Sequence, residues 1–340
     1  MAQYRVIAVE EHWASRRHIE AAADLPVWPG DALEMGLMRG AFGSSWMVDR
    51  LSDIDAHLAD MDGSGTDLSV LSLNPPGVQP YDGREAGPLV ERANDEMAEI
   101  VRRWPTRFAG LGAVDPQNPK HAAAETERVM GELGLSGLMI CSHTQGRYLD
   151  EPAFEPLLAA AEAHNAPIYL HPRMPSEQMI GPFKAYGMVA AVWGYQADAG
   201  THAVRLILSG TLDRHPKLTF VLGHLGEGLP FWMQRLDNRY AFAYRAGAET
   251  LGMGKLELTP SEYLRRNFTV TTSGMDDQRA LAFCLERLGE DNVMFAIDYP
   301  YEDSSAATEF LRTADLTDSQ RAKISHANAE RVFGIASSDA

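Results

Sequence analysis

The sequence has 340 residues, of which 45% are hydrophobic and 23% are charged, as is typical of a globular protein with a large core. Its net charge of −17 argues against nucleic acid or an anionic membrane as a partner, although a pocket can still attract a small anion. The two cysteines, Cys141 and Cys284, form no CxxC motif. This excludes a zinc finger or a disulfide framework, and it predicts a reducing, cytoplasmic location.

The N-terminal residues show no basic stretch followed by an apolar segment, so we expect no signal peptide. No apolar run approaches the roughly 18–20 residues that a membrane-spanning helix requires. We therefore expect no membrane partner.

Short apolar runs alternate along the chain with longer helical patterns. The predicted strands are RVIAV from Arg5, LSVLSL from Leu68, FAGLGAV from Phe108, GLMIC from Gly137, PIYLH from Pro167, LTFVLGH from Leu218, FTVTTS from Phe268 and NVMFAID from Asn292. Several are apolar almost throughout, which is typical of parallel strands buried on both faces.

The intervening segments carry helix start and stop signals, such as Asn118 and Pro119 before one helix and Gly134 after it. Eight strands that alternate with helices predict a single α/β domain over residues 1–340, a (β/α)₈ TIM barrel. An open doubly wound sheet is the alternative, but no glycine-rich phosphate motif follows the first strand. Residues 24–53 fit neither strand nor helix well, and we interpret them as an insertion after strand one that forms a lid or an oligomer contact.

Polar residues collect where the predicted strands end. Strand one ends in Glu10, Glu11 and His12, and strand five ends in His171. Strand six ends in His224 with Glu227 nearby, and strand eight ends in Asp298. The C-terminal ends of parallel barrel strands meet at one mouth, where active sites lie. Because residues i and i+2 of a strand share a face, Glu10 and His12 should point inward while Glu11 points away, into a helix-packing contact.

These side chains are suited to a divalent metal ion. Glu10, His12, His171 and Asp298 would supply two oxygens and two nitrogens at roughly 2.0–2.2 Å. Zn²⁺ and Mn²⁺ are both compatible with this donor set. His143, which follows strand four, is a further residue that could reach the pocket.

Several segments together resemble one known family. They are EEH at 10–12, SLNPPGVQ at 72–79, ERANDEMAE at 91–99, LHPR at 170–173, LGHLGEGLPFWMQRLD at 222–237, TTSG at 271–274 and IDYPYE at 297–302. The chain resembles, over nearly its whole length, the decarboxylase branch of the amidohydrolase superfamily. That branch includes the γ-resorcylate, 2,3-dihydroxybenzoate and 5-carboxyvanillate decarboxylases.

The resemblance implies roles for particular residues. Glu10, His12, His171 and Asp298 match the metal ligands of the family. His224 matches its active-site histidine and Glu227 the partner that orients it, while Arg235 matches an arginine that supports the acid–base residues. Trp193 matches an aromatic wall of the substrate site. Members of the family are usually homodimers or homotetramers, and they require no organic cofactor.

Two departures from the wider superfamily inform the chemistry. Glu-x-His replaces the common His-x-His of strand one, and no lysine ends strand four, where a bridging carboxylated lysine is common. Both differences predict one metal ion. Two carboxylates nearly neutralise a divalent ion, so the ion depresses the pKa of bound water less and is better suited to chelating an anionic substrate.

We therefore predict a carboxy-lyase that removes CO₂ from an ortho-hydroxylated aromatic carboxylate, with Asp298, His224 or both supplying the proton. A metal-dependent hydrolase of a lactone, amide or C–C bond is the alternative. An inactive barrel that serves as a binding protein is a third hypothesis, but no strand-end ligand is missing.

Overall fold

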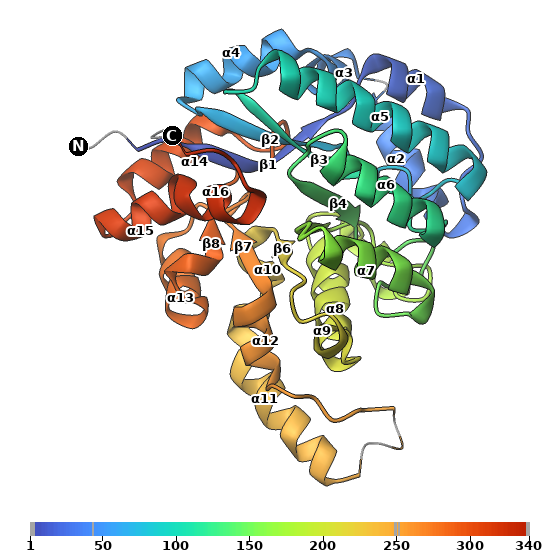
Figure 1. Ribbon diagram of the computed structural model, residues 1–340, viewed down its shortest axis with the longest axis vertical. Coiled ribbons are helices and arrows are strands. Elements are labelled where there is room, and N and C mark those ends of the chain that lie inside the picture. Colours follow the sequence, from blue (N-terminus) through green and yellow to red (C-terminus); the bar gives the residue numbers. More distant parts are fainter. Residues whose placement is uncertain (1–3, 43, 248–249, 251, 338–340) are drawn as a thin grey trace.

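The computed structural model describes residues 4–42, 44–247, 250 and 252–337. In this part of the chain eight parallel strands form one sheet, in sequence order. They are β1 (Ile7–Trp13), β2 (Leu68–Leu73), β3 (Phe108–Ala113), β4 (Gly137–Cys141), β5 (Ile168–His171), β6 (Phe220–Leu222), β7 (Phe268–Thr271) and β8 (Val293–Met294). Figure 1 shows the strands at the centre of the molecule with helices around them.

The sheet closes on itself where β1 meets the segment that follows β8. The backbone N–H of Asp298 donates to the carbonyl of Glu10 at 3.0 Å, and that of His12 donates to the carbonyl of Tyr299 at 2.8 Å. The predicted (β/α)₈ barrel is confirmed, and the open doubly wound sheet is excluded.

Helices connect the strands along the outside of the barrel. The α-helices are α1 (Arg16–Ala23), α2 (Ala32–Phe42), α3 (Ser45–Ser52), α4 (Ile54–Ser64), α5 (Gly83–Arg103), α6 (Pro119–Gly131), α7 (Glu155–Ala163), α8 (Gly194–Leu208), α9 (Thr211–Arg214), α10 (His224–Glu227), α11 (Leu229–Arg245), α12 (Pro260–Asn267), α13 (Gln278–Leu288), α14 (Ser304–Thr313), α15 (Asp318–Ala322) and α16 (Asn328–Phe333). The short 3₁₀ or π turns are η1 (Pro29–Asp31), η2 (Pro152–Phe154), η3 (Gly181–Gly187), η5 (Glu290–Asn292) and η6 (Lys323–Ala327). None of the helices within the described ranges combines the length and the apolar character needed to cross a membrane.

Strand eight is shorter than predicted. Regular pairing with β7 ends at Met294, whereas the sequence predicts a strand through Asp298. The reason is that the N–H of Phe295 donates to the carbonyl of Ile324 in η6 at 2.9 Å, so the chain leaves the ladder of β7. The following residues bond to β1 instead.

The insertion after β1 is more regular than the sequence suggests. Residues 24–53 contain η1, α2 and α3. The prediction that this segment is neither strand nor helix is therefore wrong. The sequence of α2, ALEMGLMRGAF, carries two glycines, which weaken its intrinsic helix signal. Tertiary contacts stabilise this helix, and Glu34 and Met35 are buried.

The core has two layers. Residues inside the barrel include Ile7, Val9, Val70 and Tyr169, and they form one buried cluster. A larger cluster lies between the outer faces of the strands and the surrounding helices, and it includes Ala8 and Trp13 of β1. The two faces of β1 are therefore both covered, as in other barrels of parallel strands.

His57 of α4 provides a test of this packing through pH. Its buried ring stacks on Tyr299 at 4.1 Å, and burial together with the charge of Arg107 lowers its pKa to about 3. Below pH 6.5 the unfolded chain therefore binds a proton at His57 that the folded chain excludes. The free energy of unfolding should decrease as the pH is lowered. We expect this residue alone to lower the free energy of unfolding by about 2 kcal/mol at pH 5. His57→Phe should reduce the pH dependence of the unfolding free energy by that amount, as measured by denaturant unfolding between pH 7 and 5. An unchanged dependence would contradict this assignment.

Candidate functional site

A β-bulge in β1 directs the first two candidate ligands into the barrel. The pairing of β1 with β2 shifts by one residue between Ala8 and Glu11. Val9 faces the barrel interior, and after the bulge Glu10 and His12 do so as well. Bulges are common beside active sites because they redirect a side chain without ending the strand.

Four side chains from three separate parts of the chain converge at the mouth of the barrel. One ligand atom from each of Glu10, His12, His171 and Asp298 lies within 4.8 Å of all the others. His12 Nε2 is 3.1 Å from Asp298 Oδ1, and His171 Nε2 is 3.2 Å from Glu10 Oε1. This is the juxtaposition that the sequence predicts.

The contacts of Glu10 leave one of its oxygens free for an ion. Tyr169 and Thr271 both donate a hydrogen bond to Glu10 Oε2, and the Thr271 bond measures 3.3 Å. Glu10 Oε1 is buried and forms no hydrogen bond in the part of the chain that the structure describes, although His171 Nε2, another candidate ligand atom, lies 3.2 Å away. A buried carboxylate oxygen without a hydrogen bond is costly unless a cation or water satisfies it. The site therefore fits a metal ion.

The two imidazoles are held in a suitable orientation. His171 Nδ1 donates to the carbonyl of Pro172 at 2.6 Å, and His12 Nδ1 contacts Ser72 Oγ at 3.2 Å. A hydrogen bond at Nδ1 fixes the ring and leaves Nε2 as the coordinating atom, as is usual for histidine ligands. The rings of His12 and His171 are perpendicular to each other, with centroids 4.8 Å apart.

The charges in the cluster stabilise one another. Burial favours the neutral form of Asp298, but contacts with His12 and His224 hold the pKa of this carboxyl below its usual value. Burial likewise opposes protonation of His171, yet Cys141 and Glu10 raise its pKa to about 10. Metal binding should therefore release a proton, because a histidine ligand must be neutral.

His224 lies beside the four candidate ligands. Its Nδ1 is 2.8 Å from Glu227 Oε1, and its Nε2 is 3.8 Å from Asp298 Oδ2. His224, Leu225 and Glu227 all have positive φ angles between 51° and 55°. Non-glycine residues rarely adopt this conformation, which is concentrated at functional sites. Burial opposes the protonation of His224, but the carboxylates of Glu227, Asp298 and Glu10 raise its pKa well above the usual value.

A pocket of about 980 Å³ opens beside this cluster, between α8 and α11. His224, Glu227 and Asp298 line one side of it, and Trp193 and Trp232 line another. The predicted substrate contact Trp193 is 57% exposed, so its indole ring is available to a ligand. The pocket is large enough for a small aromatic acid.

Arg235 does not join the cluster. It lies exposed on α11, and no polar contact with His224, Glu227 or Asp298 is present in the described part of the chain. Its neighbours Trp232 and Leu236 line the pocket instead. The supporting role expected for Arg235 therefore stays a prediction, because no contact in the described part of the chain tests it.

Two other residues make contacts that the sequence did not predict. Glu11 points away from the metal cluster as predicted, and it is buried. Its carboxylate accepts hydrogen bonds from the N–H groups of Ile297 at 3.1 Å and Tyr299 at 3.3 Å. The ring of His143 does not line the pocket, because its Nε2 bonds to the carbonyl of Met174 at 2.9 Å.

Sequence reasoning missed the residues that hold the ligands. Tyr169, Thr271 and Ser72 contact Glu10 and His12, and all three are buried. One signal was available for Tyr169, which lies two residues before His171 and so shares its face of β5. Nothing in the sequence alone connects Ser72 or Thr271 to a ligand.

The fold and this site define the class of the protein as a (β/α)₈-barrel enzyme with a site for one divalent metal ion. A family model described as Amidohydrolase matches residues 10–335. The chain therefore belongs to the amidohydrolase family.

Several proteins to which this chain is similar are named decarboxylases. The γ-resorcylate decarboxylase of Rhodococcus jostii is 34% identical over 97% of this chain and 98% of its own length. The structure of 5-carboxyvanillate decarboxylase from Sphingomonas paucimobilis matches with a TM-score of 0.92 and 44% identity, over 98% of this chain and 100% of that one. The 5-carboxyvanillate decarboxylase of Novosphingobium aromaticivorans was solved with manganese and 4-hydroxy-3-methoxy-5-nitrobenzoic acid. Its structure matches with a TM-score of 0.90 and 37% identity, over 97% of this chain and 96% of that one.

Removal of the Tyr169 hydroxyl should test the metal centre. Tyr169→Phe deletes a hydrogen bond to Glu10 Oε2, so we expect affinity for a divalent ion to fall about 10- to 100-fold. Titration with Mn²⁺ measures the change. Tyr263→Phe is the matched control, since Tyr263 is equally buried and donates to Asp213, outside the cluster. Equal affinities in both variants would contradict the assignment of Glu10 as a ligand.

Proposed function

We propose that the protein is a metal-dependent carboxy-lyase that removes CO₂, without oxidation, from an ortho-hydroxylated benzoate. The observation that carries the proposal is the convergence of Glu10, His12, His171 and Asp298 at the pocket that His224 lines. Decarboxylases of hydroxylated benzoates among the relatives, at 34% and 44% identity over nearly the whole chain, support the same reaction.

We assign Mn²⁺ as the metal ion. A donor set that includes two carboxylates is harder, in the chemical sense, than a set made of histidines alone. Hard oxygen ligands suit Mn²⁺. The Novosphingobium relative, solved with manganese, supports this choice. Zn²⁺ is the alternative, and metal analysis of the purified protein distinguishes the two.

The residues of the pocket would act on the substrate in two ways. When bound, a divalent ion at the four ligands supplies the positive charge that holds the carboxylate and the neighbouring phenolate oxygen. Trp193 offers an aromatic surface on the wall of the pocket for the ring. Fixing the ring in one orientation places the carbon that bears the carboxylate against the acid–base residues.

The proton that replaces the carboxylate would come from the His224–Asp298 pair. Glu227 binds Nδ1 of His224, which leaves Nε2 directed at Asp298 and the pocket. Addition of the proton to the ring carbon breaks aromaticity. Cleavage of the bond to the carboxylate then returns its electron pair to the ring, and CO₂ leaves. His224 carries a proton to deliver, because the nearby carboxylates raise its pKa. Asp298, whose pKa is held low, would deliver one only after taking it from His224.

A hydrolase with the same ligands is the second candidate. It would require a strongly activated water, which is favoured by histidine-rich or two-metal sites. Here β4 ends in Cys141, where a bridging lysine would stand, and Glu10 replaces a histidine. Both features favour decarboxylation over hydrolysis.

We further propose a cytoplasmic homo-oligomer, either a dimer or a tetramer. The helix α11 extends away from the barrel (Figure 1) and exposes Phe231, Trp232 and Phe242. Exposed aromatic clusters of this kind are typical of protein interfaces. The two cysteines are both free, as expected in a reducing compartment.

The reaction can be tested with salicylate, 2,3- and 2,6-dihydroxybenzoate and 5-carboxyvanillate. We expect CO₂ release from at least one acid, loss of activity after chelation, and recovery with Mn²⁺. In D₂O the product should carry one deuterium on the ring carbon that held the carboxylate. Incorporation of solvent ¹⁸O into the product, without CO₂, would instead establish the hydrolase.

The role of His224 can be tested by substitution. His224→Asn should lower kcat by about 10²–10⁴-fold, the usual contribution of a positioned acid. His121→Asn is a matched control, because His121 also lies between two carboxylates, Asp115 at 2.7 Å and Glu91 at 3.1 Å, but outside the pocket. Turnover of His224→Asn near that of the wild type would leave Asp298 as the proton donor.

A further inference from the structure

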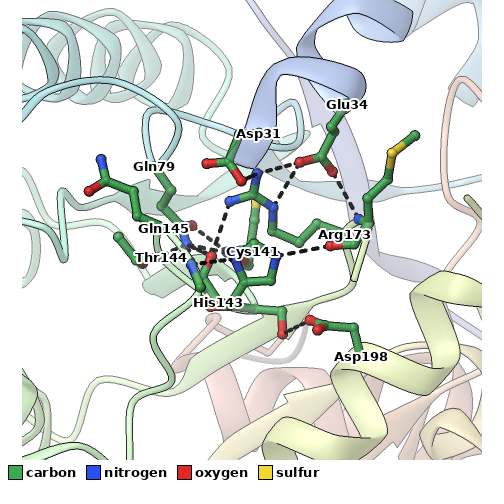
Figure 2. Close-up of polar contacts among 12 residues, drawn as sticks. Asp31, Glu34, Gln79, Cys141, His143, Thr144, Gln145, Arg173 and Asp198 are labelled. Carbon is green, nitrogen blue, oxygen red and sulfur yellow. Dashed lines mark hydrogen bonds and ion pairs between the residues drawn. The ribbon is translucent and has the colours of Figure 1, made fainter. Parts of the chain in front are cut away.

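Arg173 lies two residues after the candidate ligand His171, yet it belongs to a different set of contacts. Its side chain is completely buried. It extends toward the insertion after β1, where two carboxylates meet it (Figure 2). A guanidinium is found in such a place only when it is fully paired, because an unpaired buried charge is very costly.

Both carboxylates come from the insertion. Glu34 of α2 accepts hydrogen bonds from Nε and Nη2 of Arg173 through Oε2, and the Nε bond measures 2.9 Å. Asp31 Oδ1 lies 3.1 Å from Arg173 Nη2. Such forked contacts fix the plane of the guanidinium group as well as its position.

Glu34 also holds the backbone that follows His171. Its Oε1 accepts a hydrogen bond from the N–H of Met174 at 3.0 Å. On the other side, Nη1 of Arg173 donates to the carbonyl of His143, in the loop after β4, at 3.0 Å. Residues 173 and 174 are thus bonded to both the insertion and the end of β4, as Figure 2 shows.

This backbone controls the orientation of a candidate metal ligand. The imidazole of His171 is anchored by the bond from its Nδ1 to the carbonyl of Pro172, at 2.6 Å. That carbonyl belongs to the peptide unit shared with Arg173. A rotation of this peptide unit would turn the ring and displace Nε2 from its place 3.2 Å from Glu10 Oε1.

We propose that Glu34 and Arg173 are positioning residues for the metal ligand His171, and that they make metal affinity depend on the docking of the insertion. The inference rests on the metal centre of the proposed function. Residues outside the coordination sphere that orient a ligand typically change metal affinity 10- to 100-fold when they are replaced. Glu34 would act in this way through two intervening contacts.

Glu34→Gln tests the proposal. The glutamine can still accept from the N–H of Met174, but its amide nitrogen would then face the donors of Arg173, so the forked contact is lost. Free Mn²⁺ is followed by electron paramagnetic resonance during titration of the full chain. We expect the Kd for Mn²⁺ to rise at least tenfold, and kcat to recover at saturating Mn²⁺.

Glu125→Gln of α6 is the matched control. Glu125 is as buried as Glu34, and it accepts hydrogen bonds from Arg128 at 2.7 and 2.8 Å and from Asn94 at 2.6 Å, but no hydrogen bond in the described part of the chain joins it to a candidate metal ligand. We expect this variant to lower Tm without changing the Kd for Mn²⁺. Arg173→Lys, which keeps the charge but cannot form the fork, replaces Glu34→Gln if the latter does not fold.

Two results would overturn the inference alone. One is a Kd within twofold of the wild type in a folded Glu34→Gln or Arg173→Lys variant. The other is an equal loss of affinity in Glu125→Gln, which would mean that general destabilisation explains the effect. If the wild-type protein itself bound neither Mn²⁺ nor Zn²⁺, the metal centre of the proposed function would fail, and this inference with it.

Discussion

The site depends on the closure of the barrel between β1 and the segment after β8. The backbone bond from Asp298 to Glu10, at 3.0 Å, connects positions that are almost three hundred residues apart in the sequence. Glu11 reinforces the closure, because its buried carboxylate binds the N–H groups of Ile297 and Tyr299 on both sides of Asp298. Burial raises the pKa of Glu11 well above its usual value. Three consecutive residues of β1 therefore contribute to the site. Glu10 and His12 are candidate ligands, and Glu11 holds the backbone on both sides of the candidate ligand Asp298.

The same closure explains how Asp298 can adopt its conformation. Its φ of 79° is unusual for a residue with a side chain, and such strain persists only where the surroundings fix the backbone. Here the neighbouring peptide groups on both sides are bonded to Glu11, and the Asp298 N–H itself is bonded to Glu10. The chain turns sharply at this point and presents the carboxylate to His12 and His224 at once.

Much of the fold and of the candidate site could be predicted from the sequence. Two of the strands, Leu68–Leu73 and Gly137–Cys141, coincide with the predicted segments because an apolar run ends sharply on both sides. The four candidate ligands could be found because parallel strands deliver their C-terminal residues to one mouth, whatever their separation along the chain.

Other features depend on contacts that no local pattern reveals. The helix α2 contains two glycines and takes its stability from tertiary contacts such as that of Glu34 with Arg173. The early end of β8 results from a bond to η6. The bulge in β1 leaves no mark in the apolar pattern, although it decides which side chains enter the barrel. The sequence predicts a role for Arg235 beside the acid–base residues, yet its position on an exposed helix follows from the path of α11.

Gly223, at the end of β6, has a consequence for how the family can vary. A Cβ atom at this position would lie 3.1 Å from Glu10 Oε2, and 3.4 Å from the hydroxyl of Tyr169. The backbone angles of Gly223 are ordinary ones that other residues adopt, so the restriction is one of space and not of conformation. Homologues that keep an acid in the first strand should therefore favour glycine here, because a larger residue would require that acid to shift by a few tenths of an ångström. A single position remote from the ligands in sequence would thus indicate which branch of the family shares this coordination geometry.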